Sequence, residues 1–226
     1  MTIEVKMTNK VGTSQGVKIL VYGRPGTGKT TFCGTAPRPF ILSAESGLLS
    51  LRRSALPYIE VNSIEELESA YDYLMMPSML PHYDTICLDS VSEIAEQSLA
   101  YHKSRTRDGR KAYGDYVDQM VPLLKKFRGA PKHVIASCKQ GSIKDEIMGN
   151  ISYAPTAPGQ QLAKELPYIF DEVLNTNIGK DTAGKTFHYI RAHPDEQYEA
   201  KDRSGVLDEI EPPDASHIIA KITSNA

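Results

Sequence analysis

Short apolar runs recur along the chain from Val17 onward, and stretches with helical spacing separate them. The runs predict buried strands at residues 18–22, 39–43, 58–61, 85–88 and 133–137. Helices are predicted at 64–76, 91–102 and 116–127, and Ser63 with Glu66 forms a capping box before the first of them. Strands that alternate with helices predict an α/β fold whose mostly parallel sheet is flanked by helices.

The two ends of the chain depart from this alternation. Residues 172–178 and 186–192 flank a glycine-containing turn and predict a C-terminal antiparallel hairpin, and a last short helix should follow residues 212–214. Residues 1–16 are polar apart from a short strand predicted at 3–7. We therefore expect an N-terminal arm at 1–16 and one α/β domain at 17–226.

Composition narrows the class of protein. A chain of 226 residues that is 40% hydrophobic is long enough to bury one core without disulfides or metals. Its net charge of −2 argues against coating nucleic acid with the whole surface, so any such binding must be local. The three cysteines are widely spaced and fit neither a zinc site nor a disulfide framework. With neither a signal peptide nor an apolar run of membrane-spanning length, we expect a cytoplasmic protein without membrane partners.

Residues 23–30 carry a phosphate-binding pattern, G-x-x-x-x-G-K-T, between a predicted strand and a helix entered at Thr31. A glycine-rich loop lets successive backbone N–H groups point at phosphate oxygens, and the helix adds its positive end. Lys29 would reach the terminal phosphates, and Thr30 would hold Mg²⁺. We therefore predict ATP and Mg²⁺ as cofactors, bound by Gly23, Arg24, Pro25, Gly26, Thr27, Gly28, Lys29, Thr30 and Thr31.

The same expression matches a second time, at residues 179–186. There the residues that follow, Thr-Phe-His-Tyr-Ile, are β-branched and aromatic, so a strand follows where a phosphate loop needs a helix. We interpret this second match as a hairpin loop with no role in nucleotide binding.

Two acids are placed to act on a nucleotide at the first loop. Asp89 ends the strand predicted at 85–88, where a carboxylate would orient Mg²⁺, although an Asp in this position also caps a following helix. Hydrolysis further needs a base for the attacking water, expected on the strand beside the phosphate-loop strand. Glu45, at the end of the run 40–45, is the candidate, although a surface Glu at a strand end is common.

With these residues in place, the chain resembles the RecA-like recombinase core over about residues 17–222. It is most similar to compact phage-encoded ATPases of the single-strand annealing or recombination type. The run 40–45 resembles the family's strand that ends in the catalytic glutamate, and 86–90 its strand that ends in Asp-Ser. The resemblance implies a RecA-like ATPase domain at 17–226, with Glu45 as catalytic base and Asp89 at Mg²⁺.

The resemblance implies further catalytic residues. Residues 134–140 are similar to a strand that ends in a γ-phosphate-sensing Gln, here Gln140, although a different register would make Lys139 or Cys138 the aligned position. Lys201 and Arg203 resemble a basic element that reaches the ATP of the neighbouring subunit. Two cations spaced by two on an extended segment face the same way, but residues 202–205 are also good turn chemistry.

Two stretches are too long and irregular to be simple connectors. Residues 103–114 combine five cations and one acid with nearby tyrosines, the ingredients of a single-strand site, and are otherwise a solvated basic loop. Residues 141–159 are rich in Gly and Pro, with Lys144 and Tyr153, and would otherwise be a mobile lid. In the resembled family, loops at these positions bind single-stranded DNA. The DNA-binding candidates are Lys103, Arg105, Arg107, Arg110, Lys111 and Tyr113.

The leading hypothesis is an oligomeric ATPase, slow and DNA-stimulated, that anneals or recombines single-stranded DNA. Its partners would be single-stranded DNA, further copies of itself and a single-strand-binding protein, in the host cytoplasm if a phage encodes it. A nucleotide-gated assembly factor or helicase loader is the alternative, although a pure switch needs no Glu45. A small-molecule kinase has less support. A kinase lid carries clustered arginines over an acceptor pocket, whereas the basic stretch here precedes a further strand and helix pair.

Overall fold

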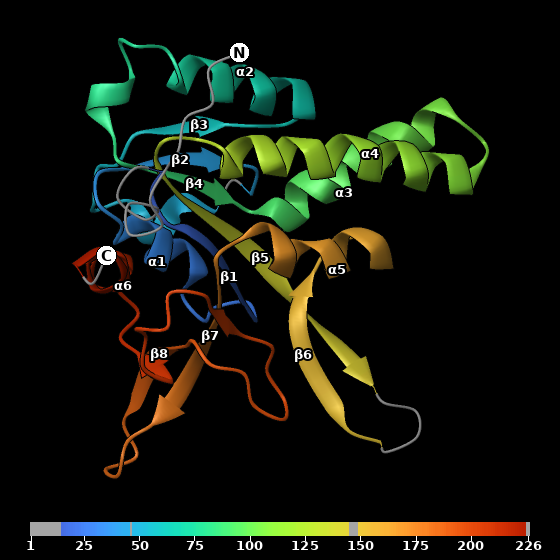
Figure 1. The fold of residues 1–226 in the computed structure, drawn as a ribbon. Helices are drawn as coiled ribbons and strands as arrows, with labels where there is room; N and C mark the ends of the chain where they lie inside the picture. The colour runs from blue at the N-terminus through green and yellow to red at the C-terminus, as the bar shows by residue number, and fades with distance from the viewer. Residues whose placement is uncertain (1–14, 46, 145–148, 225–226) are drawn as a thin grey trace, which may run out of the picture.

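A computed structural model describes residues 15–45, 47–144 and 149–224 (Figure 1). Its strands form one ten-stranded sheet in the order β10-β8-β7-β1-β5-β4-β2-β3, with β6 paired to β5 and β9 paired to β7. The strands are β1 (Lys18–Gly23), β2 (Pro39–Ser43), β3 (Tyr58–Glu60), β4 (Thr85–Asp89), β5 (His133–Lys144), β6 (Ile151–Thr156), β7 (Glu172–Lys180), β8 (Thr186–Arg191), β9 (Lys201–Asp202) and β10 (Ile210–Glu211).

Helices cover both faces of this sheet. They are α1 (Lys29–Gly34), α2 (Ile64–Leu74), α3 (Val91–Arg105), α4 (Gly109–Arg128), α5 (Gln160–Ile169) and α6 (Ala215–Ser224), with short 3-10 turns η2 (Leu48–Leu51) and η3 (Leu80–His82). Helices α2 to α5 pack on one face, and α1 and α6 on the other (Figure 1). The strand β1 is buried on both sides because Leu20 and Tyr22 enter the first core, whereas Ile19 and Val21 enter the second.

The predicted fold class is confirmed. Strands β1, β5, β4, β2 and β3 pair in parallel, as do β1 and β7, whereas β7, β8 and β10 are antiparallel. The C-terminal hairpin and the last helix lie where the sequence predicted them. The predicted strand at 3–7 lies outside the described residues, and the division into an arm and a domain stays a prediction.

One expectation about strand order is wrong. The strand that leads to Glu45 is β2, which pairs with β3 and β4 and does not neighbour the phosphate-loop strand β1. Strands β5 and β4 lie between them. The chain order of short apolar runs carries no information on which runs pair, so this error could not be avoided from the sequence.

The first of the two irregular stretches is mostly helical. Only residues 106–108 lie between α3 and α4. Asp108 starts α4 early, because its Oδ1 accepts the backbone N–H groups of Arg110 at 2.9 Å and Lys111 at 3.3 Å. The predicted basic loop at 103–114 is therefore corrected to the tip of a helical pair.

The second irregular stretch is mostly a β-hairpin. Strand β5 continues to Lys144 and pairs antiparallel with β6 from Lys139↔Thr156 to Lys144↔Ile151. The mobile lid expected at 141–159 is corrected accordingly. Helix α5, which follows it and contains Pro167, was not predicted. In the part of the chain that the structure describes, no helix combines the length and apolar character needed to cross a membrane.

Candidate nucleotide-binding site

The phosphate loop at residues 23–30 joins the carboxyl end of β1 to α1. Gly26 and Gly28 have φ values of +79° and +100°, which side-chain-bearing residues rarely adopt, so the glycines let the backbone fold back on itself. The Lys29 amine donates to the carbonyl oxygens of Gly23 at 3.0 Å and Arg24 at 3.1 Å. The loop is thus closed by its own lysine, and phosphate oxygens would replace those two carbonyls as acceptors for the Lys29 amine.

The charge on Lys29 is sensitive to its surroundings. Burial lowers the pKa of the Lys29 amine from its ordinary value, while the nearby carboxylates of Glu45 and Asp89 act to raise the same pKa. The two acids predicted from the sequence therefore lie close enough to Lys29 to act on its charge. Lys29 of α1, Asp89 of β4 and Glu45 after β2 therefore converge at the carboxyl ends of the strands.

Asp89 is buried at the carboxyl end of β4, and its peptide bond to Ser90 is cis. The Thr30 hydroxyl donates to Asp89 Oδ2 at 2.7 Å, and the Ser137 hydroxyl donates to Asp89 Oδ1. A hydroxyl beside a carboxylate is an all-oxygen donor pair of the kind that Mg²⁺ prefers. The predicted pair of metal residues, Thr30 and Asp89, therefore fits the ion.

Glu45 lies just beyond the end of β2 and is held by its neighbours. The Ser90 hydroxyl donates to Glu45 Oε1, and the preceding Ala44 N–H donates to the Asp89 carbonyl at 2.8 Å. Since Ser90 directly follows Asp89, the segment that contains the first acid also holds the second in place. The geometry suits a base that accepts a proton from a water molecule beside the phosphate loop.

The structure distinguishes the three residues that compete for the sensor position. The Lys139 amine pairs with Glu93 at 3.2 Å and Glu96 at 2.6 Å, and Cys138 is buried. Gln140 is directed toward β7 instead, where its Oε1 accepts from Asn175 Nδ2 at 3.2 Å. The same Asn175 amide reaches the carbonyl of Tyr22, the residue before the phosphate loop. Gln140 remains the candidate of the three, and a sensing role stays a prediction.

Lys201 and Arg203 lie at the opposite end of the sheet. Their strand β9 pairs with the first residues of β7, whose Glu172 is in register with Ile19 near the start of β1. The Lys201 amine donates to the carbonyls of Pro167 and Phe170, and Arg203 pairs with Asp171 at 2.8 Å. Neither cation faces the phosphate loop of its own chain, so a catalytic role requires a second subunit and stays a prediction.

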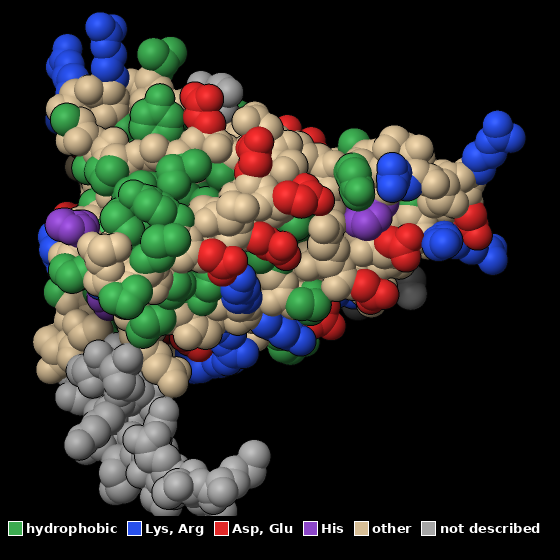
Figure 2. All heavy atoms as spheres, turned by 90° about the horizontal axis from the view of Figure 1, so that it is seen from above, with side chains coloured by type: hydrophobic (Ala, Val, Ile, Leu, Met, Phe, Trp, Pro, Cys, Tyr) green, Lys and Arg blue, Asp and Glu red, His purple; other side chains and the backbone are tan. Residues whose placement is uncertain are grey.

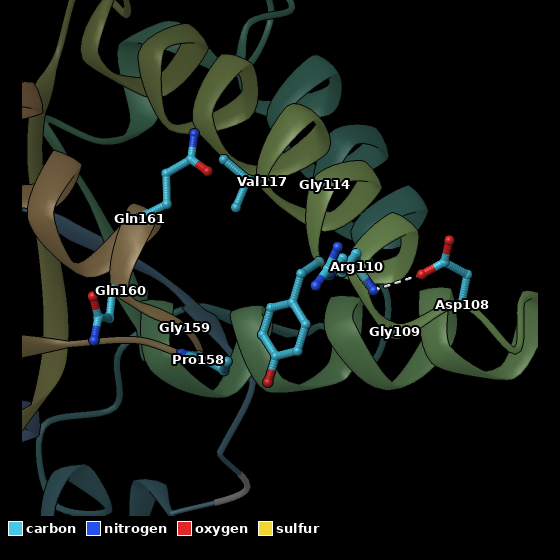
Figure 3. Close-up of a pocket in the computed structure, with 10 residues that line it drawn as sticks. Asp108, Gly109, Arg110, Gly114, Val117, Pro158, Gly159, Gln160 and Gln161 are labelled. Carbon is cyan, nitrogen blue, oxygen red and sulfur yellow. Dashed lines mark hydrogen bonds between the residues drawn. The ribbon is translucent and has the colours of Figure 1, made fainter.

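The cations predicted to bind DNA gather at the tip of the α3–α4 pair, where Figure 2 shows exposed Lys and Arg side chains at one extremity of the molecule. Lys103 lies over the ring of Tyr113 at 5.1 Å. Beside this tip, the first turns of α4 and α5 border an open pocket of about 920 Å³ lined by residues including Arg110, Tyr113, Gln160 and Gln161 (Figure 3). The structure brings these cations and an aromatic ring together on one surface.

Three site residues were missed from the sequence. Ser137 binds Asp89 from β5, and Thr176 and His188 contact Thr27 of the loop from β7 and β8. Each is more than 45 residues from its partner along the chain, so local patterning gave no indication of the contact. Only Ser137 had a local signal, its position at the end of the strand predicted at 133–137.

Most of the chain matches one known protein family. Residues 15–204 match the AAA domain family. The chain belongs to the AAA domain family. As a member with an intact phosphate loop, it is a P-loop NTPase, a class that implies nucleotide binding together with Mg²⁺. No curated protein matches this chain.

Solved structures similar to this chain include a KaiC-like protein from Pyrococcus horikoshii, with 16% identity, 78% of each chain covered and a TM-score of 0.48. The flagellar accessory protein FlaH from Methanocaldococcus jannaschii is 12% identical over 91% of each chain, with a TM-score of 0.47. A type III secretion system ATPase of pathogenic bacteria is 13% identical over 72% of this chain and 52% of its own, with a TM-score of 0.44. At these scores, no property of these proteins is transferred to this chain.

Proposed function

We propose that this AAA-domain protein hydrolyses ATP at the phosphate loop, with Glu45 as the base. The observation that carries the proposal is the convergence of three groups on one edge of the sheet: the Lys29 amine, the Thr30–Asp89 pair and the Ser90-oriented Glu45 carboxylate. In this arrangement the loop amides bind the phosphates, and Lys29 neutralises their charge. Glu45 Oε1 is fixed by Ser90, so Oε2 receives the proton of the attacking water.

Mg²⁺, held by Thr30 and oriented by Asp89, would neutralise charge on the phosphate oxygens. The protein's own contribution is to position the ligands. Asp89 accepts hydrogen bonds from two hydroxyls on different elements, Thr30 of α1 and Ser137 of β5, so its carboxylate is fixed before any ligand arrives. A preorganised carboxylate costs no rearrangement at the moment of reaction.

We further infer that the protein binds single-stranded DNA and that its active form is an oligomer with ATP between subunits. The support is local charge: exposed cations at the α3–α4 tip lie beside Tyr113, on a chain whose net charge is −2. Cations for the phosphates and aromatic faces for the bases are what a single-strand site needs. Annealing or strand exchange is the activity such an oligomer would support.

The test is ATP hydrolysis measured with and without single-stranded DNA. We expect stimulation that falls as salt rises, and loss of that stimulation in the double variant Arg105→Glu/Arg107→Glu. The matched control, Arg52→Glu/Arg53→Glu, reverses the same charge at exposed positions after η2 and should leave stimulation intact. A rate that does not respond to DNA, or equal loss in both double variants, would remove this surface from the mechanism.

A nucleotide-gated assembly factor with little hydrolysis is the second candidate. It is favoured by the closed loop, in which Lys29 is occupied by the carbonyls of Gly23 and Arg24 and must change partners when phosphate binds. Tight ATP binding with no measurable turnover, alone or with DNA, would select this candidate over the ATPase.

A further inference from the structure

The β7–β8 hairpin contacts the phosphate loop from the side opposite the two acids. Strand β1 lies between β5 and β7, and the Asp89 and Glu45 strands β4 and β2 lie beyond β5. From β7, Thr176 Oγ1 lies 2.6 Å from Thr27 Oγ1 and 3.3 Å from the Tyr22 carbonyl. From β8, His188 Nδ1 lies 3.1 Å from the Thr27 carbonyl oxygen. One loop residue, Thr27, is therefore held by both strands.

The packing of β8 explains why His188 reaches the loop. Alternate residues of a strand face the same side, so His188 shares a face with Ile190. Ile190 is fully buried in the core that contains Phe32 and Cys33 of α1. Ile190 is anchored beneath α1. His188, two residues earlier on the same face, therefore lies beside the loop that precedes this helix.

The hydrogen bond fixes the direction of a peptide group. A carbonyl oxygen only accepts, so His188 Nδ1 carries the proton and donates it. The Thr27 carbonyl and the Gly28 N–H belong to the same planar peptide and point in opposite directions. A carbonyl held toward the hairpin therefore turns the Gly28 N–H to the side away from the hairpin.

The loop has little room to choose another arrangement. The Thr27 side chain is 3% exposed, and its hydroxyl also donates to the Arg24 carbonyl at 2.8 Å. A Cβ added to Gly23 would lie 2.1 Å from Thr176 Oγ1, so β7 leaves no space for a side chain at this position of the loop. By contrast, a Cβ at Gly28 would meet only His188 Nδ1, at 3.7 Å. His188 is thus the group that borders the loop at Gly28.

We propose that His188 is a positioning residue for nucleotide phosphates. It orients the Thr27–Gly28 peptide so that the Gly28 N–H serves as a phosphate donor. This proposal rests on the proposed binding of a nucleotide at the loop, and it assigns a role in that binding to the hairpin that contains the second, non-functional motif match. It predicts that His188 acts on the phosphates and not on the base.

The experiment compares the dissociation constants of Mg-ATP, Mg-GTP and magnesium tripolyphosphate for three variants. His188→Leu removes the donor, His188→Asn keeps an N–H near the position of Nδ1, and Lys185→Ala, in the exposed turn of the same hairpin, is the matched control. We expect His188→Leu to weaken all three ligands by a similar factor, about fivefold, as one hydrogen bond allows. His188→Asn should restore most of the affinity, and Lys185→Ala should bind as the wild type does. The melting temperature without ligand should be the same in all variants.

Two results would overturn the proposal. One is a loss confined to ATP or GTP with tripolyphosphate unaffected, which would place His188 against the base. The other is an affinity in His188→Leu that does not differ from that of the Lys185→Ala control. Failure of the ATPase proposal is separate, because a wild-type protein that binds Mg-ATP without hydrolysing it still allows every comparison of affinity.

Discussion

Ser90 connects the two acids of the site to the helix that follows them. Its hydroxyl accepts the backbone N–H of Glu93 at 3.3 Å, as the N-cap of α3, and donates to Glu45 Oε1. The alternative role of Asp89 as the cap of this helix is wrong, because Ser90 is the N-cap, whereas the Asp89 carboxylate accepts hydrogen bonds from Thr30 and Ser137. A single hydroxyl stabilises the helix and orients the proposed base.

This double role gives a prediction for Ser90→Ala. Loss of the cap should lower the free energy of unfolding by about 1 kcal/mol. Loss of the hydrogen bond to Glu45 should lower kcat by about tenfold with a smaller change in KM, because a misoriented base acts only in the chemical step. The measurements are chemical denaturation and steady-state ATP hydrolysis.

The control for Ser90→Ala is Ser63→Ala. Ser63 caps α2 by accepting the Glu66 N–H at 3.2 Å, and it lies outside the nucleotide site. It should lose similar stability and keep wild-type kcat. Equal kinetic effects of the two substitutions would show that stability alone explains the loss.

At the residue scale, the site features that depend on a few consecutive residues could be predicted from the sequence. The phosphate loop, Asp89 and Glu45 each follow from a pattern within a few residues, and the structure brings them together. Ser137, Thr176 and His188 could not be found, because their partners become neighbours only when distant strands pair. The polar ends of strands are suggestive, but the register decides which of them meet.

Among the elements, the β7–β9 pair contains a buried acid that lies beside a second acid. Glu172 is 1% exposed and lies beside Asp202, and its Oε2 accepts the Arg203 N–H at 3.2 Å. Burial, followed by the charge of Asp202 and a hydrogen bond to it, raises the pKa of Glu172 from 4.5 to about 8. The folded protein therefore keeps a proton at Glu172 that the unfolded chain releases near pH 4.5.

The protonated Glu172 should make the folded protein less stable as pH rises. Because the pKa is raised on folding, the stabilisation from the bound proton is complete below the unfolded pKa of 4.5 and is lost as pH rises through the folded pKa of about 8. The melting temperature of wild type should fall over this window. Glu172→Gln, which keeps the shape and the neutral charge, should fall less steeply when melting is followed from pH 5 to pH 9. Parallel curves for the two proteins would contradict a protonated Glu172.

Element boundaries show where local patterning is insufficient. The start of α4 was missed because Asp108 caps it within a segment whose cations and glycines resemble a loop. Strand β5 was predicted to end at residue 137, but it continues as a partly exposed strand because β6 is present to pair with it. Helix α5 contains Pro167 and was not recognised. For α4 a cap, and for β5 a pairing partner, outweighs local propensity.

For the whole molecule, the position of Lys201 and Arg203 gives the oligomer proposal its form. Both side chains lie at the end of the sheet away from the phosphate loop of their own chain, so only a neighbouring copy can present its loop to them. Arg203 pairs with Asp171 in the described chain and would exchange this partner for phosphate oxygens. An arginine supplied in this way stabilises charge on the transferring phosphoryl group.

Mixing two inactive variants tests this arrangement. Lys29→Ala lacks the phosphate lysine but keeps Arg203, and Arg203→Ala has the reverse defect. We expect each alone to hydrolyse little ATP and the mixture to recover activity, because some interfaces then combine an intact loop with an intact arginine. If mixed oligomers form but stay inactive, or if Arg203→Ala alone keeps wild-type turnover, the shared site is contradicted.

The account depends most on the claim that the phosphate loop and Glu45 form an ATP-hydrolysing site. The direct measurement is single-turnover hydrolysis of Mg-ATP by Glu45→Gln, together with its ATP dissociation constant. We predict binding close to that of wild type and hydrolysis slower by about 100-fold or more, the loss typical of a removed general base. Wild-type turnover in Glu45→Gln would contradict the assignment of the base.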